Sequence, residues 1–231
     1  MNAIVPPEYF HADLLHPSRR LWKRILSDCS QGTIETSILG LDRTGDTPGA
    51  LAPEIWFSFL KSGDTSELMG ICEHNLRDIR GLASLMLLQG SIAASPLETL
   101  GAFKFDLESL ALLWRKEEQI SGEILLREAA ERQMPRALYV YGLDLLKANE
   151  KENARRCLLT LASSVPSASV DLKAAAYRAL AIDAEWREGD FHTALAHTSS
   201  AQALPGIKLS LVHEPERRRE RLVKKALEFR L

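Results

Sequence analysis

The sequence lacks several features that would assign it to a class at once. Its three cysteines, Cys29, Cys72 and Cys157, are far apart and odd in number, which argues against a disulfide framework or a zinc site. No apolar run reaches the roughly eighteen residues of a membrane span. The first residues show neither the basic start nor the apolar stretch of a signal peptide. We therefore expect a cytoplasmic protein that does not contact a membrane.

A charge excess of one sign is also missing. Lysine and arginine number 29 and aspartate and glutamate 31, for a formal net charge of -2. Such a chain has no global attraction to nucleic acid, so any binding of that kind needs a local basic patch. The chain has no glycine-rich phosphate loop. The length of 231 residues and the 45% hydrophobic content fit a soluble globular protein of one large or two small domains.

The first 91 residues predict helices with hardly any strand. His11–Leu15 is the one candidate strand, and a lone strand cannot satisfy its own backbone, which suggests that a sheet is missing. The spacing of apolar residues after this point predicts four helices. Gly40 should end the second, Pro53 should lie in the first turn of the third, and Asp64 should cap the fourth. The four helices are expected at residues 18–27, 33–39, 53–61 and 65–89.

The rest of the chain predicts helical hairpins after a linker at residues 92–104. Two hairpins align at an offset of forty residues, which places Asn149 on Gly189 at the turn and Ala154 on Ala194 at the helix crossing. The stretch 179–204 resembles a tetratricopeptide repeat. We expect a repeat domain at 105–231, closed by a charged helix at 214–230. Apolar neighbours at helical spacing suggest core positions for Cys72, Cys157 and the tryptophans Trp22, Trp56, Trp114 and Trp186.

One joint pattern is more specific than any single motif. It begins at Phe10 and runs through DLLHPSRRLW, CSQGTIETSILG and GDTPGALAPEIWFSFLKSGD to His74-Asn75-Leu76-Arg77-Asp78. In this order and spacing, the segments resemble the closing third of a YprB-type ribonuclease H-like exonuclease domain. The resemblance covers roughly residues 10–90 and implies that residues 1–91 are the carboxyl-terminal remnant of an α/β domain with little or no sheet left.

The resemblance implies a two-metal nuclease chemistry and roles for five residues. Four carboxylates would hold two Mg²⁺ or Mn²⁺ ions that act on a nucleic-acid phosphodiester. Asp78 matches the last of these carboxylates and is the candidate metal ligand, with His74 one helical turn away to orient or deprotonate the attacking water. The candidate substrate-binding residues are Arg19, Arg20 and Asn75. The Asp-x-Glu and Asn-Gly-Lys-x-Phe-Asp motifs of the family have no counterpart in suitable context.

Each candidate also has a simpler interpretation. His74 and Asp78 could form a solvated helix face, and Arg19 and Arg20 could do the same. His11, Asp13 and His16 could be metal ligands, but Asp13 is better explained as a cap or turn residue and His16 as an extended residue before Pro17. Asp183-Ala184-Glu185 has the Asp-x-Glu form but lies in a helical repeat, and the arginines at 217–221 alternate with glutamates as in a salt-bridged exposed helix.

The function that these patterns favour is a truncated exonuclease, inactive as this chain alone because one carboxylate cannot hold two metals. If Met1 results from truncation or a frameshift, a longer product could be active. The alternative is a non-catalytic module whose helical repeats bind a protein partner. A third possibility is a non-functional fragment of low stability, since its front helices would expose apolar faces meant for a sheet.

Overall fold

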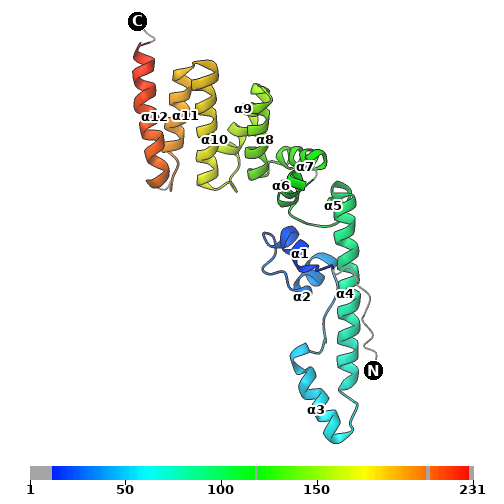
Figure 1. Cartoon of the computed structure of the whole chain (residues 1–231). Coiled ribbons are helices and arrows are strands. Elements are labelled where there is room, and N and C mark those ends of the chain that lie inside the picture. The colour runs from blue at the N-terminus through cyan, green and yellow to red at the C-terminus, as the bar shows by residue number, and fades with distance from the viewer. Residues whose placement is uncertain (1–11, 118, 207–208, 229–231) are drawn as a thin grey trace, which may run out of the picture. The chain divides into compact units, whose positions relative to one another are not determined.

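The protein is mainly helical and divides into two compact units. The computed structural model describes residues 12–117, 119–206 and 209–228, and the units comprise residues 1–109 and 110–231. None of the residues described lies in a strand, and all regular elements are helices (Figure 1). The expectation of a mainly α chain is confirmed. Among these residues no helix combines the length and the apolar character needed to cross a bilayer.

The first unit is built around one long helix. Figure 1 shows α1 and α2 beside the middle of α4, and α3 beside its beginning. The elements are α1 (Leu15–Trp22), α2 (Gln31–Ile34), the π-helical turn η1 (Glu35–Leu39), the 3-10 turn η2 (Gly49–Leu51), α3 (Ala52–Ser62), α4 (Leu68–Ala94) and α5 (Pro96–Ala102).

The core of this unit joins α1 to α4 and to the segment that follows α5. Trp22 is fully buried, and its indole Nε1 donates a hydrogen bond of 2.9 Å to the carbonyl of Lys104. The backbone N–H of Asp106 donates to the carbonyl of Leu21 at 2.8 Å. From α4, Leu85, Leu88 and Ile92 are buried. These contacts hold residues 103–109 against α1. The linker expected at residues 92–104 contains the end of α4 and all of α5, and the first unit continues past it.

Two details of the first unit differ from the expectation: the strand at its start, and the cap predicted at Asp64, because α4 begins at Leu68 with no side-chain cap. His11 lies outside the described residues, but the strand predicted at His11–Leu15 is wrong for the remainder, because Leu15 begins α1 and its N–H is capped by the carboxylate of Asp13 at 2.8 Å. Pro17 sits in the first turn of that helix, where no intrahelical N–H is required. The predicted helix end at Gly40 and the proline in the first turn of α3 are both confirmed.

The second unit is a series of antiparallel helices, in which each helix after the first packs on the next. Leu222 of the last helix is fully buried against this stack. The series runs from α6 (Leu107–Glu117), whose first residues belong to the first unit, through α7 (Gln119–Glu131), α8 (Pro135–Lys147), α9 (Lys151–Leu159) with η3 (Thr160–Ser164), α10 (Val170–Asp183) with η4 (Ala184–Glu188), and α11 (Phe191–Gln202) to α12 (Leu209–Glu228).

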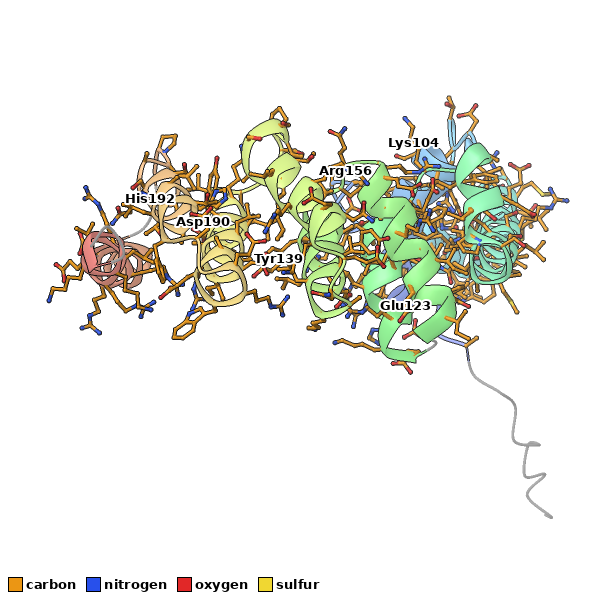
Figure 2. All side chains as sticks on the ribbon, turned by 90° about the horizontal axis from the view of Figure 1, so that it is seen from above. Lys104, Glu123, Tyr139, Arg156, Asp190 and His192 are labelled. Atoms are coloured by element: carbon orange, nitrogen blue, oxygen red, sulfur yellow. The ribbon has the colours of Figure 1, made fainter. Side chains whose placement is uncertain are left out.

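The forty-residue offset seen in the sequence is present in the backbone. Asn149 and Gly189 occupy equivalent turns with φ of 63° and 67°, in the left-handed region that Gly and Asn tolerate best. Ala154 and Ala194 are both completely buried where the helices of each hairpin meet. After the second turn, Asp190 caps α11 by accepting a hydrogen bond from Thr193 N–H at 2.9 Å, and Asp190 and His192 lie together at this helix start (Figure 2). Each copy is therefore a hairpin that turns at one left-handed residue, and the second turn differs in that it follows the π-helical η4.

Some side chains expected in the core are on the surface. Cys72 is exposed, so its prediction as a core residue is wrong, while Cys157 is half-buried. Trp56 and Trp186 are 50% and 66% exposed, in contrast to the buried Trp22. Trp186 instead lies under the ammonium group of Lys225, 5.0 Å from the ring centroid, a cation–π arrangement. Spacing alone did not distinguish the inner from the outer face of these helices.

Candidate functional site

The candidate site forms where the loop at residues 42–49 folds onto α4. His74 and Asp78 lie one helical turn apart on α4 and both face this loop. Gly70, one turn earlier, lets the loop approach, because a Cβ there would lie 2.5 Å from Thr47 Oγ1. Asp42 opens the loop by accepting hydrogen bonds from both the N–H and the hydroxyl of Thr44. The site thus depends on the turn at Asp42–Thr44 and on the absence of a side chain at Gly70.

His74 is held between two aspartates. Its Nδ1 lies 3.0 Å from Asp46 Oδ1, and its Nε2 lies 3.4 Å from Asp78 Oδ2. Burial favours the neutral carboxyl of Asp46, but the hydrogen bond from His74 and the positive charges nearby outweigh it and lower the pKa of Asp46. Those charges include Arg77, 3.4 Å from Asp46. The imidazole is therefore fixed at both nitrogens, with little freedom to rotate.

Arg43 is the hub of the same cluster. Its guanidinium contacts three carboxylates: Glu35 through Nε, Asp78 through one terminal nitrogen, and Asp46 through the other at 3.3 Å. Burial alone would lower the pKa of Arg43, but the hydrogen bonds to Asp78 and Glu35 raise it. Such a planar fork with five donors suits several carboxylates at once. Arg43 therefore joins η1, the loop and α4.

Glu35 is the deepest member of the cluster. Its side chain is 2% exposed and accepts a second hydrogen bond, 2.6 Å long, from Gln31 Nε2, which also donates to the carbonyl of Asp78 at 2.8 Å. The carboxylate lies directly on Gly81 of α4, where a Cβ would be only 1.6 Å from Glu35 Oε1. The absence of a side chain at Gly81 makes room for this buried, fully bonded carboxylate.

The structure brings together two of the five residues assigned to the site from the sequence. His74 and Asp78 share the cluster. Asn75 is exposed on the adjoining side of α4, and Arg19 and Arg20 are exposed on α1. None of these three residues takes part in the ion pairs of the cluster. Sequence reasoning missed Glu35, Arg43 and Asp46. The one available sign was that the turn-rich segment DRTGDTPG carries an arginine and two further aspartates, which is more charge than a turn needs.

Other candidates have structural explanations. Asp13 caps α1 and its carboxylate lies 3.8 Å from His16, both exposed. In the Asp-x-Glu of the second unit, Asp183 lies 3.5 Å from Arg155, and Glu185 accepts a 2.7 Å hydrogen bond from Arg221. Both carboxylates are buried and bridge helices.

The donor set around Asp78 does not fit a divalent metal ion as it stands. One Asp78 oxygen contacts the Arg43 guanidinium and the other faces His74, so positive or donor groups occupy the positions that a metal would take. Elsewhere in the described residues, no group of three or more His, Cys, Asp or Glu side chains is arranged to hold a metal. The cluster is a closed network of ion pairs and hydrogen bonds that orients His74, and both Asp78 oxygens are occupied within it.

Comparison with known proteins finds similarity in the first part of the chain. The family model described as RNase_H superfamily matches residues 2–88. The uncharacterized protein YprB of Bacillus subtilis (strain 168) is 46% identical over 81 residues, which is 35% of this chain and 20% of YprB. The chain thus spans about a fifth of the length of that curated relative. No solved structure matches the chain.

Proposed function

Because residues 2–88 are similar to the RNase H superfamily and to YprB, we propose that the first unit is the carboxyl-terminal part of a nuclease domain. The domain would hydrolyse phosphodiester bonds of nucleic acid in the cytoplasm with Mg²⁺ or Mn²⁺. These 231 residues would not perform the reaction unaided. The observation that carries the proposal is the pairing of His74 with Asp78 on one face of α4, within the residues 2–88 that match the family model.

His74 and Asp78 have distinct roles in this proposal. His74, held at Nδ1 by Asp46, would orient or deprotonate the attacking water through Nε2, which would have to part from the Asp78 carboxylate 3.4 Å away. Asp78 would supply one carboxylate oxygen to a metal ion. Asn75, exposed on α4, and the exposed Arg19 and Arg20 would contact the nucleic acid, the arginines through phosphate oxygens.

The same geometry explains why activity would need further residues. Binding of a metal at Asp78 requires that Arg43 release it, because the guanidinium and a divalent cation compete for the same oxygen. Two metals need several carboxylates, and Glu35 and Asp46 are committed to Arg43 and His74. The remaining ligands would have to come from outside these 231 residues.

The test is a nuclease assay on the purified chain. Labelled single-stranded and duplex DNA and RNA are incubated with Mg²⁺ or Mn²⁺, with Asp78→Asn as the matched control. We expect no cleavage above that control. Metal-dependent cleavage by the wild type that disappears in Asp78→Asn would overturn the statement that the chain alone is inactive.

A second measurement tests membership of a nuclease domain. The endogenous protein is isolated from its source cells, its intact mass is compared with 25.7 kDa, and its activity is assayed. We expect metal-dependent cleavage that is lost in the Asp78→Asn and His74→Ala variants expressed in the same cells. Full activity in both variants would contradict the proposed roles.

A groove in the second unit favours a second role, binding of a protein partner. The groove has a volume of about 190 Å³ and lies between α8 and α10, where Figure 2 shows Tyr139. Its lining combines apolar side chains with those of Arg178, Asp183 and Arg187, and an apolar wall with a few polar groups is typical of a binding pocket. We expect Tyr139→Ala to abolish retention of a partner from source-cell extract and Lys173→Ala, which lies on α10 outside the groove lining, to preserve it; equal retention by both would exclude the groove.

A further inference from the structure

Helix α4 carries two apolar faces, and the fold of the first unit uses only one of them. The inner face places Leu85, Leu88 and Ile92 in the core. A second stripe repeats at alternating spacings of three and four residues and consists of Met69, Cys72, Leu76, Ile79, Ala83 and Met86. This spacing is that of the a and d positions of a helix pair.

The second stripe is open to solvent along its whole length. Met69, Leu76, Ile79 and Met86 are 64%, 47%, 66% and 59% exposed, and Cys72 and Ala83 are exposed as well. Isolated exposed apolar residues are ordinary, but a continuous stripe of them over five turns of one helix marks a contact surface.

The order of residues within the stripe makes it complementary to itself. When two copies of α4 run antiparallel about a two-fold axis between Arg77 and Asp78, every a position meets a d position of the other copy. The large Met69 then faces Met86 and Leu76 faces Ile79, while the small Cys72 faces Ala83. A two-fold axis creates each of these contacts twice.

The charges beside the stripe agree with the same arrangement. Glu73 and Arg80 flank the seam on one side of α4, and the antiparallel register sets Glu73 of each copy against Arg80 of the other. The side chain of Glu73 is 59% exposed and lies 4.0 Å from Arg77 in its own chain, so it can reach across. On the other side of the seam Asn75 would meet Leu82, so neither side brings like charges together.

A hollow at one end of the stripe adds a shape argument. About 510 Å³ of space lies beside Ala83 and Met86, lined by apolar residues that include Leu14 and Leu82. In the antiparallel register this is where Met69 of the other copy arrives. An unbranched methionine side chain adapts readily to such an irregular space.

We propose that the exposed stripe of α4 binds a second copy of this chain, as an antiparallel helix pair with its two-fold axis between Arg77 and Asp78. The pairing leaves the candidate site open in both copies, because His74 and Asp78 lie on the side of α4 that faces the loop at 42–49 and not on the seam. The inference does not depend on the proposed nuclease role.

The first test is the mass of the full chain in solution by sedimentation or light scattering. At tens of micromolar we expect the wild type to have twice the chain mass of 25.7 kDa. We expect the Ile79→Glu variant to have the mass of one chain, and the Ile79 side chain is too exposed to be needed for folding. A wild type that stays monomeric at this concentration, or an Ile79→Glu variant that stays dimeric, would overturn the proposal.

The second test fixes the direction of the helices. Under mild oxidation Ala83→Cys should give a disulfide-linked dimer through Cys72 of the other copy, and the wild type and the Cys72→Ser/Ala83→Cys double variant should not. A cross-link in the wild type that Cys72→Ser abolishes would mean a parallel pair and would overturn the proposed register.

The third test uses the flanking charges. Glu73→Arg places arginines opposite each other twice and should weaken the dimer by roughly tenfold, as expected for two exposed pairs. Adding Arg80→Glu restores opposite charges and should return the dissociation constant to near the wild-type value. Failure of the second substitution to restore affinity would contradict the antiparallel register.

Discussion

Arg43 shows how one residue organises the candidate site. Burying Glu35 without a partner would cost several kcal/mol, and the guanidinium offsets that cost while also binding Asp46 and Asp78. A lysine could not replace it, since a single ammonium lacks the planar fork that meets three carboxylates at once. The position of His74 therefore depends indirectly on an arginine more than thirty residues earlier in the chain.

Gly81 provides a stability test of this packing. Gly81→Ala introduces a Cβ 1.6 Å from the Glu35 carboxylate, so we expect the substitution to lower the free energy of unfolding by about 1–3 kcal/mol. Gly90→Ala in the same helix meets nothing within 4 Å and should raise it by about 0.5–1 kcal/mol. Urea denaturation of the two variants checks both signs. Equal effects would mean that Glu35 is not seated on Gly81.

Asp46 gives the site a defined pH dependence. Its pKa in the folded protein lies below the ordinary 3.8, so the folded state binds fewer protons than the unfolded state in this range and loses stability as the pH falls through and below 3.8. Asp46→Asn removes this contribution. We expect the variant to be less stable than the wild type at pH 7 and the two curves to converge toward pH 3. Parallel curves in urea titrations at several pH values would contradict the assignment.

At the scale of elements, sequence patterns predicted the helices well and their faces poorly. Proline in the first turn of α3, glycine after η1 and the turn at Gly189-Asp190 are local features, and each lies where expected. The three-to-four spacing on α4 fits two faces equally, so it could not tell that Leu85 is buried and Ile79 exposed. That difference arises from which segments pack against the helix, and those contacts are distant in sequence.

The candidate site shows the same limit. His74 and Asp78 could be paired from their spacing because a helix fixes the geometry of residues four apart. Arg43 and Glu35 could not, because their contacts with Asp78 depend on how a loop and a π-helical turn close onto α4. Long-range ion pairs leave no periodic pattern in a sequence.

Helix α12 is attached through a buried carboxylate. Glu185 of η4 lies among Arg218, Arg221 and Lys225 of α12, and its side chain is fully buried. We expect Glu185→Ala to lower the stability of the second unit by somewhat less than the roughly 3–5 kcal/mol of a fully buried pair, because Arg221 and Lys225 are partly solvated. Glu220→Ala, on the exposed side of α12, should change little. Thermal unfolding of both variants measures the difference, and equal transitions would refute this role.

At the scale of the whole molecule, the two units predict independent folding. A polypeptide of residues 105–231 contains all the hairpins and should be helical by circular dichroism, with its own cooperative unfolding transition. We expect that transition to match one of those in the full chain. Loss of helicity on removal of residues 1–104 would show that the second unit needs the first.

The equivalent turns at Asn149 and Gly189 have a consequence for how such chains vary in length. Both turns contain one residue in the left-handed region, and a buried alanine follows five residues later in each. We therefore expect that joining residue 148 to residue 189 would let α11 pack on α8 in the place of α9. Natural variants of this unit should therefore gain or lose material in steps of one hairpin, about forty residues, without disturbing their neighbours. The unit can therefore be lengthened or shortened by whole hairpins.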